Sequence, residues 1–233
     1  MQNCARFVVS SIFLPDCIPP KYQEKAEEVR AYLVQIRGGA PFLSGADGQA
    51  LIRWLDDEVP VPAILSAIDS VCERRRAKRV RTRLSLKVCA GNLRKILGKT
   101  AKKNIKSVGK NPICDLATQI KQMEVPKNLV EKKNSLVEKM LKISDTQLRT
   151  EQNISQVMHA GRAFHAEAWI QAEPEQEQLQ IDSEQELSAL RKILPAIKWQ
   201  EAVEEVMRDK VRMRYPLISA QKIWDAINQT DID

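Results

Sequence analysis

Apolar residues recur at intervals of three and four along most of the chain, which is the spacing of an α-helix with one buried face. The first such stripe begins near Lys21 and is closed by Gly38-Gly39. Its apolar members are Tyr22, Ala26, Val29, Leu33 and Ile36. The pattern predicts an amphipathic helix of about four turns.

Two more helices are predicted before the chain becomes strongly basic. Ser44 is a suitable N-cap, and Asp47 is placed three residues later to complete a capping box. The next helix begins at Pro60 or Pro62, because proline is well tolerated in the first turn of a helix. Its last turn carries three arginines, which suit the negative end of the helix dipole.

A fourth helix is predicted over residues 84–97, and Gly98 is expected to end it. Residues 98–111 are rich in Lys and Gly and poor in apolar side chains, which is typical of a linker or a mobile arm. A boundary between domains is therefore predicted in this region. The predicted units are an N-terminal helical domain over 1–100, a linker over 101–111 and a C-terminal helical bundle over 112–233.

Helical spacing continues in the C-terminal part. One helix is predicted from Ile113, another after Pro126, and a third after a cap at Ser144-Asp145. These helices are expected to fold back on one another as a bundle. With only eight glycines in the chain and long runs of good helix formers, the predicted fold class is all-α.

Residues 171–186 are acidic, rich in Gln and without a basic residue, which predicts a solvated loop. This loop is expected to end at an N-cap on Ser183. Pro195 is expected to kink or restart the helix that follows. Ser219 is a suitable N-cap for a last short helix.

The basic stretch, residues 74–110, is the strongest electrostatic feature of the sequence. Its 37 residues include 15 Lys or Arg and no Asp or Glu, whereas the rest of the chain sums to about −8. Such a concentration of charge is typical of contact with a polyanion. The candidate nucleic-acid-binding residues are Arg74, Arg75, Arg76, Lys78, Arg79, Arg81, Arg83, Lys87, Arg94, Lys95, Lys99, Lys102, Lys103 and Lys106.

The basic stretch has two interpretations. Either it follows a phosphate backbone, or it is a solvated surface that meets the acidic segment 171–186 in the same chain or in a second copy. Few aromatic residues lie within the stretch, so bases have no evident stacking partner there. Sequence-tolerant contact with the backbone of DNA or RNA is therefore the hypothesis, and the pattern does not separate the two nucleic acids.

No familiar catalytic, cofactor-binding or metal-binding motif accompanies the basic stretch. His159 and His165 are six residues apart and fall on different faces of a helix, so they are not expected to share a metal ion. Five cysteines without a CxxC pair indicate reduced thiols and a cytoplasmic protein. The apolar patch at residues 7–14 is too short to span a bilayer, and an extended or strand segment without a membrane role is expected.

Residues 42–97 contain the run FLSGADGQALIRWLDDEVPVPAILSAIDSVCERR, followed by apolar residues at every fourth position from Cys89. This region resembles the C-terminal helical domain of DnaD-like bacterial replication and primosome proteins. The aromatic and Trp-bearing motif that follows in that family is absent here. The resemblance covers about a quarter of the chain and implies DNA binding.

Together these patterns predict a non-enzymatic protein without cofactor that binds nucleic acid through the basic stretch, alone or as a subunit of a larger nucleoprotein complex. The C-terminal helices are expected to bind a protein partner. The alternative is a structural or adaptor subunit whose basic stretch docks on an acidic protein.

Overall fold

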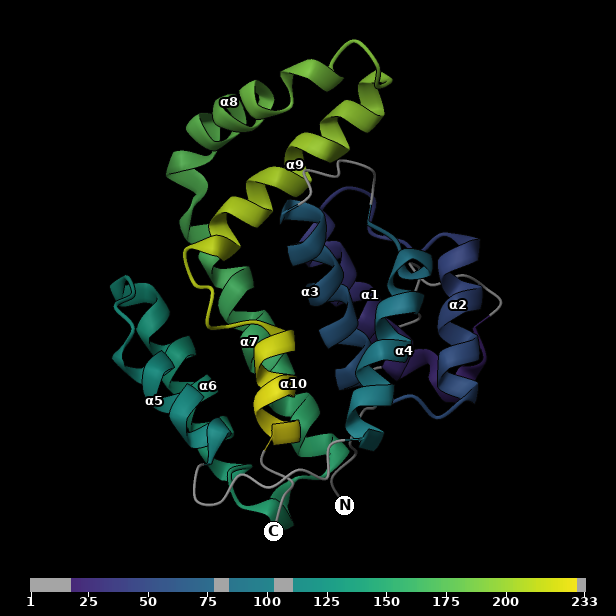
Figure 1. Ribbon diagram of the computed structural model, residues 1–233. Helices are drawn as coiled ribbons and strands as arrows, with labels where there is room; N and C mark the ends of the chain where they lie inside the picture. The colour runs from purple at the N-terminus through teal and green to yellow at the C-terminus, as the bar shows by residue number, and fades with distance from the viewer. Residues whose placement is uncertain (1–17, 78–83, 103–110, 230–233) are drawn as a thin grey trace, which may run out of the picture.

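Helices make up most of the computed structural model, which describes residues 18–77, 84–102 and 111–229 (Figure 1). These ranges contain no strand, so the all-α prediction is confirmed. The α-helices are α1 Gln23–Arg37, α2 Gly45–Asp56, α3 Val61–Ala77, α4 Leu86–Lys102, α5 Pro112–Gln122, α6 Val130–Lys142, α7 Glu151–Gln171, α8 Gln176–Glu186, α9 Ala196–Met213 and α10 Ala220–Gln229. Short 3-10 turns precede five of them, at Pro20–Tyr22, Lys127–Leu129, Thr146–Leu148, Glu173–Glu175 and Ser188–Leu190.

Local sequence signals account for several helix ends. Gly38 and Gly39 have φ of 66° and 69°, and they end α1 where a side chain would be strained. A Cβ at Gly38 would also lie 2.4 Å from the Glu204 side chain of α9. Ser44 and Ser219 each accept a hydrogen bond from the backbone N–H three residues on, so both predicted N-caps are confirmed.

α3 is the central helix of the fold. From Val61 to Ile68 every side chain is buried, because α1, α4, α7 and α10 pack around it. Ala63, Ser66 and Ala67 are small enough to let these neighbours approach closely. A helix that is buried on all sides belongs in the interior of a domain, whereas its sequence pattern predicted only one buried stripe.

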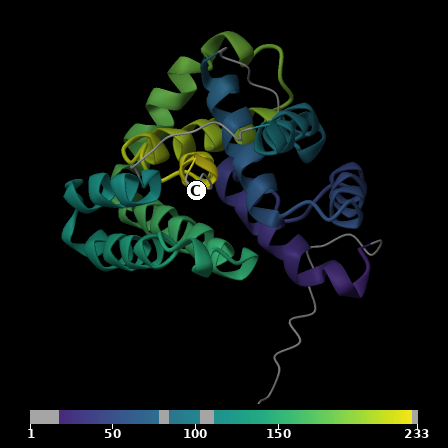
Figure 2. The same ribbon diagram turned by 60° about the horizontal axis from the view of Figure 1, so that its bottom comes forward.

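The remaining helices flank this centre on two sides. α5, α6 and α7 pack in sequence order on one side, while α2 and α4 lie on the other (Figures 1 and 2). α8 and α9 pair at the top of Figure 1, and α9 continues down against α1. α10 then returns the chain to the centre, between α3 and α5.

Buried residues from both sides of the predicted linker belong to one hydrophobic cluster. α10 packs against α3 and α9 against α1, so helices far apart in sequence share the core. The division into domains at 1–100 and 112–233, with a linker at 101–111, stays a prediction. The apolar patch at residues 7–14 lies outside the described residues.

Two of the sequence predictions for loops are wrong. α4 continues through Gly98 to Lys102, because the residues after Gly98 include good helix formers and one glycine costs a helix only about 1 kcal/mol. The acidic segment 171–186 forms a 3-10 turn and α8 rather than a solvated loop. Leu179 and Ser183 are buried there, and α8 packs along α9, which offsets the weak amphipathic pattern.

Two predicted caps are also placed differently. Thr150, not Ser144-Asp145, caps the long helix α7 by accepting a hydrogen bond from the N–H of Asn153. Ser183 is no N-cap, since its hydroxyl lies inside α8 and donates to the carbonyl of Leu179. A new helix, α9, starts directly after Pro195, as predicted.

Candidate nucleic-acid interface

Asp47 holds the start of α4 against α2. Its Oδ1 accepts a hydrogen bond at 2.8 Å from the N–H of Leu86, in the first turn of α4. Its Oδ2 lies 3.9 Å from Nη1 of Arg37, and both side chains are 3% exposed. The expected capping box of α2 is thus only half formed, because the Asp47 carboxylate serves the positive end of α4 instead.

α4 buries one face and leaves its basic residues on the others. Leu86, Cys89 and Leu93 are buried in the core, and burial raises the pKa of the Cys89 thiol to about 12. Lys87, Arg94 and Lys95 are exposed. The cations of α4 are therefore exposed on a helix that the core holds in place.

Arg75 and Arg76, at the end of α3, are bound within the protein. Arg76 donates two hydrogen bonds to Asp209 of α9, with Nε to Oδ2 at 2.5 Å and Nη2 to Oδ1 at 2.6 Å. Arg75 is 8% exposed and lies 3.4 Å from Glu205. Burial raises the pKa of Glu205, and the neighbouring Arg75 opposes that shift. Both arginines thus neutralise acidic residues of α9, more than a hundred residues later in the sequence.

The other predicted site residues fall into two groups. Arg74 is exposed beside the two paired arginines, and the backbone of Lys99 and Lys102 belongs to the last turns of α4. The remaining predicted site residues lie outside the described residues: Lys78, Arg79, Arg81, Arg83, Lys103 and Lys106.

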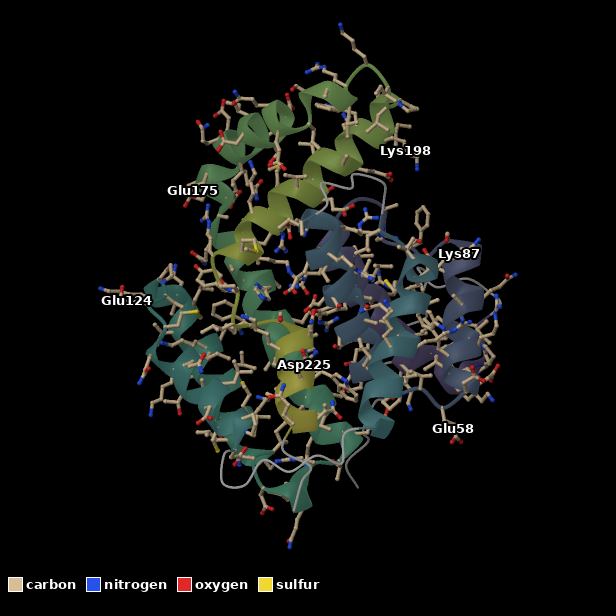
Figure 3. The ribbon with its side chains drawn as sticks, viewed as in Figure 1. Glu58, Lys87, Glu124, Glu175, Lys198 and Asp225 are labelled. Atoms are coloured by element: carbon tan, nitrogen blue, oxygen red, sulfur yellow. The ribbon has the colours of Figure 1, made fainter. Side chains whose placement is uncertain are left out.

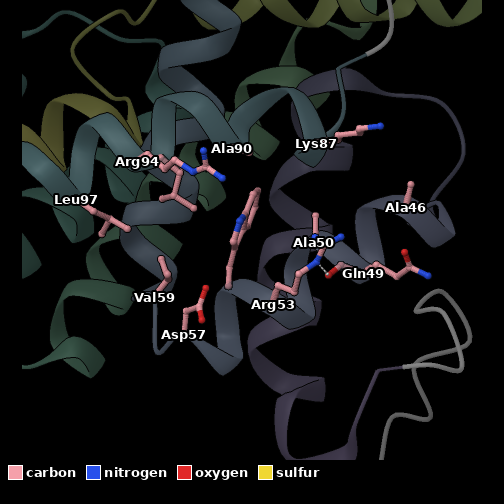
Figure 4. Close-up of a pocket in the computed structure, with 12 residues that line it drawn as sticks. Ala46, Gln49, Ala50, Arg53, Asp57, Val59, Lys87, Ala90, Arg94 and Leu97 are labelled. Atoms are coloured by element: carbon pink, nitrogen blue, oxygen red, sulfur yellow. Dashed lines mark hydrogen bonds between the residues drawn. The ribbon is translucent and has the colours of Figure 1, made fainter.

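A groove of about 410 Å³ lies between α2 and α4. Figure 4 shows Arg94 of α4 and Arg53 of α2 on its two walls, with Lys87 at one end and Asp57 and Leu97 at the other. Arg53 donates a hydrogen bond of 3.4 Å to the carbonyl of Gln49. Three cations thus line the groove with one carboxylate, which gives it a positive field.

Trp54 supplies the groove with an aromatic ring. It is half-buried, and it lines the groove together with Leu93, Ala50 and Ala90. Sequence reasoning missed Trp54 and Arg53 because both precede the basic stretch. The sequence did contain a signal for these two residues. Arg53 and Trp54 are adjacent, and they fall on the edge of the apolar stripe of α2.

The acidic segment 171–186 lies away from this groove. Figure 3 shows Glu175 and Lys87 at well separated places on the molecule. Glu175 pairs with Arg214 at 2.7 Å, Glu184 with Arg191 at 3.8 Å, and Glu186 with Lys210 at 3.6 Å. These contacts join the acidic segment to α9 and to the turn that precedes it.

The two histidines occupy different environments. His159 is exposed, whereas His165 is buried and its Nε2 donates a hydrogen bond to the carbonyl of Ile218. Burial lowers the pKa of His165 to about 4, with Arg212 adding to the shift. Within the described ranges, no cluster of His, Cys, Asp and Glu side chains is suited to a metal ion.

None of the described helices is both long and apolar enough to cross a bilayer. No protein-family model, curated protein or solved structure matches the chain. The resemblance of residues 42–97 to DnaD-like proteins therefore stays a prediction. All the residues that line the groove fall within that range.

Proposed function

We propose that the protein binds single-stranded nucleic acid through the groove between α2 and α4, without a catalytic step. The observation that carries the proposal is the meeting of exposed Arg53, Lys87 and Arg94 around the half-buried ring of Trp54. Proteins that bind single strands combine a basic groove for the phosphates with aromatic rings for the bases. In duplex DNA the bases already stack on one another, so they gain less from stacking on such a ring.

The electrostatic part of the proposal rests on counter-ion release. Among the described residues, no carboxylate lies within ion-pair distance of Arg53, Lys87 or Arg94. A cation that is not paired with a carboxylate of the protein can neutralise a phosphate and release its counter-ions, which makes affinity depend on salt. The resemblance to DnaD-like proteins supports the same function, and free thiols at Cys72, Cys89 and Cys114 support a place in the cytoplasm.

The experiment measures binding by fluorescence anisotropy for labelled single-stranded DNA, RNA and duplex DNA, across about 50 to 200 mM salt. The test variant combines Arg53→Gln, Lys87→Gln and Arg94→Gln. We expect it to lose more than tenfold in affinity and to flatten the salt slope by about 2, since each single-strand phosphate contact contributes about 0.7.

A matched control combines Lys121→Gln, Lys127→Gln and Lys132→Gln, which removes the same charge from exposed positions around α5 and α6. We expect the control to retain most of the affinity. If the two triple variants lost the same affinity, net charge alone would account for the effect, and the groove would not be the binding site. Absence of binding by the unmodified protein at the lowest salt would refute the proposal.

A second candidate is an adaptor role with an acidic protein partner. Ile193 and Ile197 are 73% and 72% exposed, and the exposed cations Arg191, Lys192 and Lys198 flank them. Large apolar side chains at this exposure are typical of an interaction surface when they cluster. Replacing both isoleucines with serine is expected to leave oligonucleotide binding unchanged, so this surface and the groove can be tested separately.

A further inference from the structure

Phe42 is the most exposed aromatic side chain of the described structure. It is 54% exposed, whereas the other Phe, Tyr and Trp side chains of the described ranges are buried or half-buried. The next residue, Leu43, is 4% exposed and anchors the same segment in the core. The ring of Phe42 therefore lies in water on a segment that is itself attached to the fold.

Three side chains hold the backbone of this segment in place. Nη2 of Arg37 donates a hydrogen bond of 2.8 Å to the carbonyl of Phe42, and Arg30 donates to the carbonyl of the preceding residue. From α9, Glu204 accepts a hydrogen bond of 2.9 Å from the N–H of Gly39. A side chain on a backbone fixed in this way is preorganised for a ligand, because little ordering remains to be done on binding.

The same contacts connect Phe42 to the end of the groove at which Lys87 lies. Arg37 also lies 3.9 Å from Asp47 of α2, and Asp47 accepts the hydrogen bond of 2.8 Å from the N–H of Leu86 in α4. Lys87 follows Leu86 directly and lines the groove. The backbone of Phe42 and the first turns of both groove helices therefore belong to one connected junction.

The lengths involved suit a short strand. Ala46 lines the groove four residues after Phe42, so their Cα atoms are at most about 14 Å apart even along a fully extended chain. Trp54 lies eight residues beyond Ala46 on α2, which is about 12 Å of helix rise. Stacked nucleotides repeat at about 3.4 Å along a strand, so about eight nucleotides or fewer reach from one ring to the other.

An exposed phenyl ring next to cations has the chemistry of a stacking residue. Its faces are apolar and its π-system stacks on any base, so the contact tolerates every sequence. The ring has no charge and no hydrogen-bonding group, so it adds affinity without adding a phosphate contact. Lys87 is exposed at the same end of the groove and can neutralise the neighbouring phosphate.

We propose that Phe42 stacks on an unpaired base at the Lys87 end of the groove, and that it is the second aromatic residue of the strand-binding site after Trp54. The proposal rests on the function proposed for the groove and extends that site beyond it. A ligand must then carry an unpaired base at each ring, which makes a single strand of both rings' span the preferred class of ligand.

The experiment combines changes in the protein with the loss of single bases from the strand. Anisotropy measures the affinity for a homopolymer of about eight nucleotides, and for the same strand with one abasic position placed at each site in turn. We expect Phe42→Ala to weaken binding of the intact strand about 5-fold or more, which is the usual effect of losing one stacked base. Phe42→Tyr keeps an aromatic ring and should retain the affinity.

The abasic strands test whether the ring acts through a base. At one abasic position the loss caused by Phe42→Ala should disappear, because the base that would stack on the ring is already missing. A different position should cancel the loss caused by Trp54→Leu. The salt slope should be the same for Phe42→Ala and the unmodified protein, since no charge is removed.

The control is Ile170→Ala in the last turn of α7. Ile170 is 57% exposed and lies on the other side of α3 from the groove (Figure 1), so its removal takes away a similar apolar surface at a distant place. Affinity should not change in this control. The urea midpoint should be unchanged for Phe42→Ala as well, because the ring is largely in water, so a loss of binding is not a loss of fold.

The outcomes distinguish this proposal from the function proposed for the groove. If strands bind and the groove triple variant weakens them, but Phe42→Ala binds as tightly as the unmodified protein, the role of Phe42 alone is overturned. A loss that stays the same at every abasic position, or that Phe42→Tyr shares in full, also overturns it, because the ring then does not act by stacking. A protein that binds no strand would refute both proposals.

Discussion

Asp69 should be one of the most sensitive positions for stability, because its carboxylate joins three helices. Its Oδ1 accepts a hydrogen bond at 2.7 Å from Arg212 of α9, and its Oδ2 accepts two from the first turn of α10. Asp69 is 1% exposed, and the Arg212 side chain is 12% exposed. The change Asp69→Asn keeps the shape but places an amide N–H against other donors.

The expected cost follows from the charge that is left behind. Removal of one partner of a buried ion pair costs about 3–5 kcal/mol, because the other charge stays buried without compensation. For a chain of this size, that loss lowers the melting temperature by about 6–20 °C. Asp57→Asn, at an exposed carboxylate, is the control and should change stability by less than about 0.5 kcal/mol.

The assay is urea unfolding followed by far-UV circular dichroism and by tryptophan fluorescence. A double-mutant cycle with Arg212→Met isolates the interaction, and the double variant should lose at least 0.5 kcal/mol less than the two single losses combined. A loss under about 1 kcal/mol for Asp69→Asn, or strict additivity in the cycle, would refute this account of the junction. Because Asp69 precedes the predicted linker and Arg212 follows it, coincident transitions would also show that both halves unfold together.

Two further predictions concern Asp47 and His165. Asp47→Asn should cost about 3 kcal/mol in urea unfolding, since Arg37 loses a buried carboxylate and α4 a charged cap, whereas Ser44→Ala should cost only about 1 kcal/mol. If the two losses are equal, Asp47 acts only as a cap. The pKa of His165 is about 4 in the native state and about 6.5 when unfolded, so the unfolded state binds the proton first as pH falls. The unfolding free energy should therefore decrease between pH 6.5 and 4 by up to about 3 kcal/mol. Burial raises the pKa values of Glu28, Glu73 and Glu205, which favours the native state over the same range, so the measurement is the difference between the unmodified protein and His165→Gln. A variant with the same pH dependence as the unmodified protein would contradict the role of His165.

The sequence by itself determined most of the helices and many of their ends. Helical periodicity, proline and N-cap signals depend on residues within a few positions of one another, so they can be read locally. Ser44, Pro195 and Ser219 act as predicted, and Gly38-Gly39 ends α1. The prediction from local composition was wrong at α8. Composition suggested a loop there, but packing of Leu179 and Ser183 against the rest of the fold favours a helix.

Only the tertiary structure decided which basic residues remain available for a ligand. Arg75 and Arg76 belong to the same charged run as Lys87 and Arg94, yet they pair with Glu205 and Asp209, and nothing in the run distinguishes them. Likewise, the position of Trp54 beside the α4 cations does not follow from spacing along the chain. These arrangements depend on which helix faces meet, and that is set by packing between residues as far apart as α3 and α10.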